Sequence, residues 1–445
     1  MKKLPIKLSD HFTYGKLLRF TVPSMIMMVF TSIYGIVDGF FVSNYAGKTA
    51  FAAVNFIIPF LIIISTPGYM FGTGGSALVS KLMGEGKKEE AVRIFSLLVY
   101  AALIFGAVIS TLSLIFLRSI VTWMGAEGRL LEDCLVYGRI LVAATPVYIL
   151  QVLFQSFFVA AEKPNLGLLT TVIGGVTNMI LDYLLVGVLP LGLVGAALAS
   201  AFSQIIGGVF PLIYFFLPNS SLLRLGKTGY NGRAILQATT NGASELMSNV
   251  SMSLVGMLYN VQLLQYAGED GVAAYGAMMY VSMIFASLFF GFSIGSAPVI
   301  GFHFGAADHR ELRSLKQKSL GIVSCFAVVM IVSALLLSTP LSRLFVGYDR
   351  DLMALTVRGM RIYSFCYPFM GYAICLSGFF TALNDGLTSA AISFLRTVVF
   401  QVAAVLLLPM IWGIDGIWSS LLVAESMAAT VSFYFLLRKQ KIYKY

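Results

Sequence analysis

The sequence is poor in charge. Only 11% of its 445 residues are Asp, Glu, Lys or Arg, whereas 58% are hydrophobic. A soluble protein of this length carries roughly 25% charged residues, and no globular core could bury so much apolar side chain. Lipid must therefore surround much of the chain, which excludes the classes of soluble enzyme and soluble binding protein.

Cysteine and histidine are scarce as well. The three histidines form no cluster, and we expect His303 and His309, which follow the eighth apolar run, to be solvated. The four cysteines show no CxxC spacing, so we interpret them as small buried hydrophobic residues without metal or redox chemistry. They are Cys134, Cys325, Cys366 and Cys375.

Two further motifs are absent. The glycines at 72, 74 and 75 are not followed by Lys-Ser/Thr and no strand precedes them, so they are not a phosphate-binding loop. No run of Lys and Arg resembles a nucleic-acid-binding arm. We therefore expect no nucleotide, no nucleic acid and no organic cofactor. The N-terminal segment MKKLPIKLSDHFTYGK also lacks the short apolar stretch of a cleaved signal.

Long apolar runs dominate instead. A helix that spans a bilayer needs about 20 mostly apolar residues, and helices satisfy their own backbone groups where lipid cannot. Unbroken runs such as LVYAALIFGAVISTLSLIFL argue against a β-barrel. We predict twelve spanning helices, at residues 17–41, 51–80, 92–117, 136–160, 166–189, 193–216, 233–263, 272–300, 317–338, 357–382, 388–411 and 416–437.

The basic residues predict an orientation. Most of the 30 Lys and Arg residues fall in the N-terminus, the C-terminus and the alternate connections that share their side. Because cytoplasmic segments carry the excess of basic residues, both termini are predicted to be cytoplasmic. We expect a multi-pass protein of the plasma (inner) membrane that acts as a monomer.

The two halves of the chain repeat each other. Residues of the first half recur 221 positions later: Tyr45, Ala46, Gly47, Phe71, Gly74 and Gly84 recur as Tyr266, Ala267, Gly268, Phe292, Gly295 and Gly305. Because six helices per half is an even number, the two halves insert the same way up, as in a parallel repeat. The predicted fold is an all-α membrane protein of two six-helix bundles, with lobes at 1–216 and 233–445 and a cytoplasmic linker at 217–232.

Four polar residues of the first half are candidates for an ion site, since ionisable groups inside a membrane are functional by default. At about 1.5 Å per residue, all four fall in the outer half of the membrane. Hard oxygen ligands suit Na⁺, or a proton shared between two carboxylates. For Asp38 alone, a carboxylate that reaches water from the helix end is an alternative. The four are Asp38, Asn178, Asp182 and Ser200, and the positions 221 after the first three hold no carboxylate or amide but Tyr259, Val399 and Ala403.

The second half carries charges of its own. Glu245, Arg396 and Glu425 all lie roughly mid-membrane by the same depth arithmetic. Arg396 is placed to pair with Glu425, or alternatively with Glu245. Glu245 is a candidate for a second protonation site or for contact with a cationic substrate. We interpret the many Phe and Met residues as lipid-embedded packing rather than as an aromatic drug cage.

The chain resembles the multidrug and toxic compound extrusion (MATE) family. The stretches that carry the resemblance are TVPSMIMMVFTSIYGIVDGFFVSNYAG, GTGGSALVSKLMGEGKKEEA, QSFFVAAEKPNLGLLTTVIGGVTNMILDYLL, LGLVGAALASAFSQ, SGFFTALNDGLTSAAISFLRTVVFQV and GIWSSLLVAES. The resemblance implies two lobes in a V shape that export small organic drugs or metabolites, cationic or amphipathic, in exchange for H⁺ or Na⁺. Such a protein is not an enzyme.

The resemblance also bears on individual residues. It implies an ion site at Asp38, Asn178 and Asp182, with Ser200 standing where Thr is usual, and Glu245 matches an acidic position of some members. The acid that others carry on their tenth helix is missing from YPFMGYAICLSGFF. A flippase for lipid-linked oligosaccharides is the alternative within the same superfamily. A receptor or an intramembrane enzyme is the alternative from another class, and no catalytic constellation at membrane depth favours it.

Overall fold

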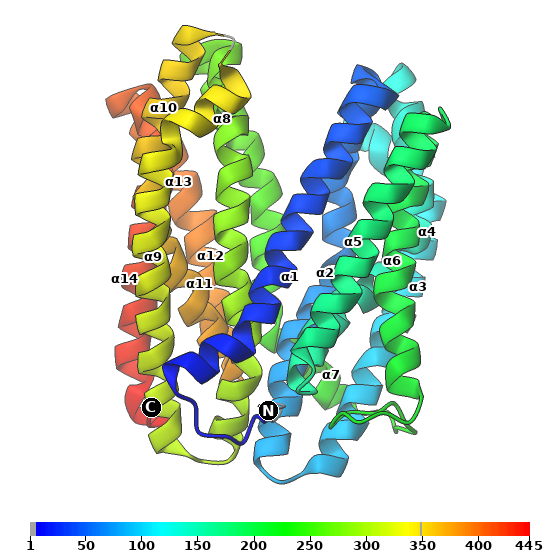
Figure 1. Cartoon of the computed structure of the whole chain (residues 1–445), viewed down its shortest axis with the longest axis vertical. Helices are drawn as coiled ribbons and strands as arrows, with labels where there is room; N and C mark the ends of the chain where they lie inside the picture. Colours follow the sequence, from blue (N-terminus) through cyan, green and yellow to red (C-terminus); the bar gives the residue numbers. More distant parts are fainter. Residues whose placement is uncertain (1–5, 348) are drawn as a thin grey trace, which may run out of the picture.

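The computed structural model of this chain describes residues 6–347 and 349–445, and this part is built from helices (Figure 1). The α-helices are α1 (Tyr14–Phe41), α2 (Lys48–Gly84), α3 (Lys88–Trp123), α4 (Gly128–Ala160), α5 (Pro164–Asp182), α6 (Gly192–Phe216), α7 (Gly232–Asn241), α8 (Ala243–Gly305), α9 (His309–Val346), α10 (Arg350–Ser364), α11 (Tyr367–Ala382), α12 (Gly386–Phe394), α13 (Gln401–Trp412) and α14 (Ile414–Tyr443). Three π-helical segments interrupt them, η1 (Val42–Ala46), η2 (Tyr183–Val188) and η3 (Leu395–Phe400).

The helices account for the predicted membrane spans. Within the described residues, ten helices are long and apolar enough to cross a membrane, and the bent pair α10 and α11 makes an eleventh. One of the ten, α8, is two helices that meet at Gly268, whose φ of 62° and ψ of −151° are not helical. With α8 counted as two, the described part of the chain contains twelve spans. The predicted all-α membrane fold is confirmed.

Two predicted spans are broken. The helix predicted at 357–382 bends by 46° between α10 and α11, because Pro368 in the first turn of α11 has no N–H to continue the helical ladder. The helix predicted at 233–263 divides at Gly242, which ends α7 and precedes α8. A side chain at Gly242 would collide with α2, since a Cβ there would lie 2.2 Å from the Met70 carbonyl oxygen.

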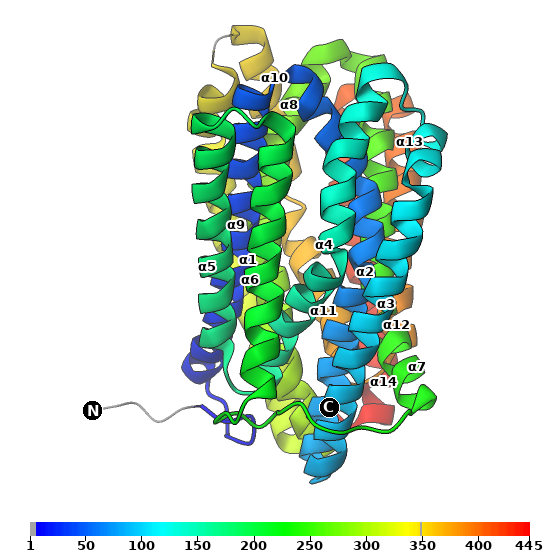
Figure 2. The same cartoon turned by 90° about the vertical axis from the view of Figure 1, so that its right-hand side faces the viewer.

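The helices form two groups. Figure 1 shows α1 to α6 on one side and α8 to α14 on the other, close together at the end where both termini lie and diverging toward the other end. The view in Figure 2 places α7 beside the lower end of α3, and α7 also contacts α2. Both termini lie at one end, as an even number of spans requires. The lobe boundaries at 216 and 233 stay predictions.

The two groups touch through glycines at the end where the termini lie. We call Gly74, Gly84, Gly242 and Gly305 the glycine seam. A Cβ at Gly84 would lie 2.0 Å from the Phe302 carbonyl oxygen, and one at Gly305 would lie 2.0 Å from the Lys81 carbonyl oxygen. Any side chain would force the two backbones apart, so the close approach of α2 and α8 depends on glycine. Gly84 and Gly305 are equivalent positions of the sequence repeat.

The segment before α1, residues 6–13, bridges the same end, and we call it the terminal strap. Its Leu8 N–H donates to Glu162 Oε1 at 2.6 Å, between α4 and α5, and its Phe12 N–H donates to Glu311 Oε1 at 2.9 Å, on α9. Leu8 and Phe12 are fully buried. The Phe12 ring packs edge-on against His303 at 6.3 Å. The prediction that His303 is solvated is therefore wrong, since His303 is only 4% exposed.

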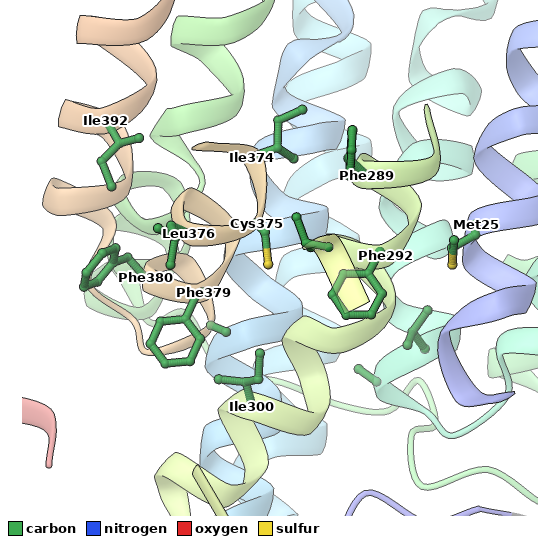
Figure 3. Close-up of a cluster of buried hydrophobic side chains, with 14 of the residues drawn as sticks. Met25, Phe289, Phe292, Ile300, Ile374, Cys375, Leu376, Phe379, Phe380 and Ile392 are labelled. Atoms are coloured by element: carbon green, nitrogen blue, oxygen red, sulfur yellow. The ribbon is translucent and has the colours of Figure 1, made fainter. Parts of the chain in front are cut away.

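The apolar core of the second half lies between α8 and α11. Figure 3 shows Phe289, Phe292 and Ile300 of α8 near Ile374 and Phe379 of α11, and all of these side chains are buried. Met25 of α1 belongs to the same buried cluster, so the core continues across the boundary between the two groups. Three of the four free cysteines are buried as expected, whereas Cys325 is exposed.

Candidate functional site

The structure brings together the four polar residues predicted in the first half. Asp38 comes from α1, Asn178 and Asp182 lie one turn apart on α5, and Ser200 comes from α6. The Asp38 side chain lies against those of Asn178, Asp182 and Ser200. We call these four residues the first-lobe polar cluster. It forms because α5 packs against both α1 and α6.

Several oxygens of the cluster have no hydrogen-bond partner. Oδ1 of Asp38, Oδ1 of Asn178 and both carboxylate oxygens of Asp182 are buried and have no partner at full hydrogen-bond geometry within the described part of the chain, although the side chains themselves lie against one another. Asp182 is 0% exposed and Asn178 is 1% exposed. Buried polar atoms are almost always paired in folded proteins, so these four oxygens call for a shared proton, a bound cation or water from outside the cluster. The donor set suits either, because all its ligands are hard oxygens.

The cluster does not resemble a multivalent metal centre. Within residues 6–347 and 349–445, no group of three or more His, Cys, Asp and Glu side chains could hold a metal ion. Two carboxylates, one amide and one hydroxyl carry at most two negative charges. This charge suits a proton or a monovalent cation better than a divalent one.

Sequence reasoning missed Tyr137. This residue of α4 is 3% exposed, and its hydroxyl lies beside Ser200 and close to Asp38 and Asp182. Its only sequence signal was a hydroxyl on a membrane helix, which many of the 21 tyrosines share. Only the packing of α4 against α6 selects it.

A cavity adjoins the cluster inside the first lobe. Asn178 and Ser200 line it together with Tyr34, Tyr148 and Gln204, and its empty volume is about 690 Å³. The Tyr148 and Tyr69 hydroxyls are 3.2 Å apart. Asp38 and Asp182 are not among the lining residues of this cavity. The amide and the hydroxyl are therefore the members of the cluster that line the cavity.

The backbone departs from the α-helix beside three of the predicted residues. The α-helical part of α5 ends at Asp182 and η2 follows directly, while Arg396 lies inside η3. The segment η1 starts at Val42, whose N–H donates to the Asp38 carbonyl oxygen. Single π-helical turns are rare in helices and are frequent at functional sites. Their positions single out the same residues as the sequence did.

Arg396 and Glu425 meet in the second half. Arg396 Nε lies 2.9 Å from Oε1 and 2.8 Å from Oε2 of Glu425. The two side chains are 12% and 3% exposed. Glu245 has no hydrogen bond or ion pair through its side chain in the described part of the chain, so the alternative pairing of Arg396 with Glu245 is not formed.

Glu245 and Arg396 share a second cavity, which we call the central pocket. It lies between the two groups of helices, since Thr73, Ser76 and Ser156 line it from α2 and α4 while the remaining residues come from α8, α11, α12 and η3. Its empty volume is about 570 Å³. Thus the first-half candidates gather in one lobe, whereas Glu245 and Arg396 face a space that both halves enclose.

Known proteins resemble the chain over almost all of its length. The chain is 26% identical to the multidrug export protein MepA of Staphylococcus haemolyticus over 423 residues, which cover 95% of this chain and 92% of the relative. It is 24% identical to MepA of Staphylococcus aureus, over 94% of this chain and 92% of the relative. At these identities, neither relative by itself shows to which family the chain belongs.

Solved structures show the same fold. One is an outward-facing multidrug resistance MATE transporter of the MOP superfamily, with a TM-score of 0.92 and 22% identity over 98% of this chain and 97% of the other. Another is a MOP superfamily transporter from Pyrococcus furiosus, described as having a binding pocket of reverse polarity, with a TM-score of 0.90 and 22% identity over 98% of each chain.

The family model named MatE matches the chain twice, at residues 23–184 and at residues 246–407. The two matches fall one in each half, as the sequence repeat predicts, and together they cover more than half of the chain. The chain is a multi-pass membrane protein, and it belongs to the MATE family of efflux transporters.

Proposed function

We propose that this chain is a secondary active antiporter that exports small organic drugs or metabolites, cationic or amphipathic, in exchange for H⁺ or Na⁺. The observation that carries the proposal is the set of four unpaired buried oxygens in the first-lobe polar cluster. The relatives named multidrug export protein support the direction of transport and the substrate class. The proposal keeps Asp38, Asn178, Asp182 and Ser200 as the coupling residues.

The cluster provides a physical basis for coupling. With no proton or cation bound, the adjacent carboxylates of Asp38 and Asp182 repel each other and their oxygens lack donors, which favours an arrangement that admits water. Binding of H⁺ or Na⁺ removes that penalty and favours a dry, closed cluster. An ion that binds one arrangement better shifts the population toward it. Since α1 carries Asp38 and also packs against α8 of the other group, a change in α1 reaches the central pocket.

The oligosaccharide flippase is less well supported. Carriers of anionic lipid-linked sugars need cationic side chains in the cleft. The lining of the central pocket contains one arginine, Arg396, and Glu425 already neutralises it. The central pocket therefore offers no free positive charge to such a substrate.

The remaining expectations from the sequence are part of the proposal. We propose that the protein resides in the plasma membrane, has both termini in the cytoplasm and works as a monomer. The bacterial relatives support the location, and the shared position of the termini supports their common side (Figure 1).

Proteoliposomes test the antiport mechanism. Uptake of two radiolabelled monocations, one polyhydroxylated and one aromatic, is measured under an imposed pH gradient and, separately, under an imposed Na⁺ gradient. Asp38→Asn and Asp182→Asn should each reduce gradient-driven uptake to the level of empty liposomes. Asp351→Asn, which changes an exposed carboxylate on α10, is the matched control. Uptake near that of the unmodified protein in both cluster variants, at equal incorporation, would refute the assignment of the cluster.

A further inference from the structure

The wall of the central pocket is rich in hydroxyl groups. Of its 16 lining residues, nine are serine or threonine, and its one aromatic residue is Phe290. Pockets for drug-like ligands are lined mainly by apolar and aromatic side chains with a few polar groups. The central pocket reverses that proportion, although phenylalanine is abundant in the chain as a whole, with 35 residues.

Several of these hydroxyls are free to bind a ligand. Ser156, Ser244, Ser248 and Ser293 make no hydrogen bond through their side chains in the part of the chain that the structure describes. By contrast, Ser377, Thr381 and Ser393 bond to one another directly or through Ser389, at distances of 2.7 to 3.2 Å. The pocket thus has one wall of satisfied hydroxyls and another of unsatisfied ones.

The unsatisfied hydroxyls line the same pocket as the unpaired carboxylate. Ser244 and Ser248 flank Glu245 on the first turns of α8. Ser293 stands on the later part of α8, over Gly378 of α11, where a Cβ would lie 1.9 Å from the Ser293 Oγ. Gly378 therefore leaves the room that the Ser293 hydroxyl occupies. The serine hydroxyls on these turns therefore share the pocket with a single acidic side chain, that of Glu245.

The charged side chains of the pocket lining also limit the charge of a ligand. Glu425 neutralises Arg396, so Glu245 is the one acidic or basic side chain of the lining without a partner. A ligand that carries one positive charge would complete this set. Further charges on the ligand would have no counterpart.

We propose that the central pocket is selective for hydrophilic monocations that carry several hydroxyl or amide groups, and that it disfavours aromatic cations of the same charge. This inference rests on the proposed function, whose substrate class it narrows. An aromatic cation would displace water from the serine hydroxyls without replacing its hydrogen bonds, and unpaired polar groups in a closed site weaken binding strongly. A hydroxylated cation satisfies the serines and Glu245 together.

Binding to the purified full chain tests the proposal without any ion gradient. N-methyl-D-glucamine, a polyhydroxylated monocation, and tetraphenylphosphonium, an aromatic monocation, are titrated while the thermal unfolding midpoint is followed. N-methyl-D-glucamine should stabilise the protein at lower concentration. The double variant Ser244→Ala, Ser248→Ala should weaken its binding roughly tenfold and leave that of tetraphenylphosphonium unchanged or improved.

Two further variants complete the test. Glu245→Gln should weaken both cations, because it removes the charge that they share. Ser432→Ala, which removes a buried hydroxyl of α14 that already bonds to the Ala428 carbonyl oxygen at 2.7 Å, should change neither. If one of the alanines prevents folding, Ser293→Ala alone is the replacement.

The results separate this inference from the proposed function. The inference is overturned if tetraphenylphosphonium binds more tightly than N-methyl-D-glucamine, or if the serine variants affect N-methyl-D-glucamine no more than Ser432→Ala does. If the binding pattern is as expected but no gradient drives transport of either cation, the proposed antiport fails while the selectivity of the pocket stands.

Discussion

Arg396 and Glu425 should be coupled energetically. Both oxygens of Glu425 lie within 2.9 Å of Arg396 Nε, and the pair is nearly buried, at 12% and 3% exposure. Removing one partner of a buried pair leaves an uncompensated charge and costs about 3–5 kcal/mol. We expect Arg396→Met and Glu425→Leu each to lower the free energy of unfolding by about this amount. The double variant should lose much less than the sum, because neither charge remains.

The double-mutant cycle has a control on the same protein. Arg358 and Asp415 also form an ion pair, but their side chains are 65% and 32% exposed, and exposed pairs contribute only about 0.2–1 kcal/mol. Free energies of unfolding are measured in mixed micelles by denaturant titration, followed through the loss of helical circular dichroism. A double variant of Arg396 and Glu425 that loses the full sum of the single variants would mean no pairing. Glu245 would then become the partner to test.

Three further predictions follow from the end of the molecule where the termini lie. Gly305→Ala should part α2 from α8 and so raise maleimide labelling of Ala77→Cys, a fully buried site, in a background without Cys325. Gly256→Ala is the control, because a Cβ at Gly256 has no atom within 4 Å. Equal labelling in the two variants would contradict the role of the glycine seam. Burial opposes ionisation of Asp385, yet hydrogen bonds from Lys439 and Thr388 hold the pKa of that carboxyl below its usual 3.8. Its stabilisation is therefore present above about pH 4 and lost at lower pH, so Asp385→Asn should lower the unfolding midpoint at pH 7 and this difference should shrink below pH 4; a difference that does not depend on pH would count against the contact. Tags on both termini should react only from the cytoplasmic side, and labelling of either one from outside would overturn the orientation.

The sequence predicted the spans because lipid imposes a strong condition on them. A run of about 20 apolar residues is stable in a bilayer as a helix. The prediction of a span therefore hardly depends on the periodicity of polar residues along the run. The breaks were harder to foresee. Pro368 ends a helix at the start of α11, whereas Pro146 lies inside α4. Proline alone therefore does not locate a bend, since the neighbouring helices decide whether the chain can continue.

The first-lobe polar cluster could be predicted because its residues are unusual where they lie. Carboxylates at membrane depth are rare and costly, so Asp38 and Asp182 stood out before their positions were known. The same reasoning could not find Tyr137 or the serines of the central pocket. Hydroxyls are tolerated in membrane helices, where they bond to the preceding turn, as Thr73 does to the Tyr69 carbonyl oxygen. Which of them face a cavity depends on how helices from different halves pack.

The environment of His303 likewise depends on packing that the sequence alone does not predict. Its position after a long apolar run indicated a solvated loop, but the terminal strap, almost 300 residues earlier in the chain, folds over it. Contacts between segments this far apart leave no periodic signal in a single sequence.

The glycine seam has a mechanical consequence. Interfaces built from interlocked side chains must withdraw each side chain from its neighbours before they can separate, and many dispersion contacts are lost at once. At Gly84 and Gly305 backbone meets backbone, and separation exposes carbonyl groups that water can hydrogen-bond immediately. We therefore expect this interface to separate with little loss of side-chain packing. Because Gly84 and Gly305 are equivalent positions of the repeat and each packs against the backbone of the other's helix, a single methyl group added to either one would hold the two helices apart and keep the interface from closing.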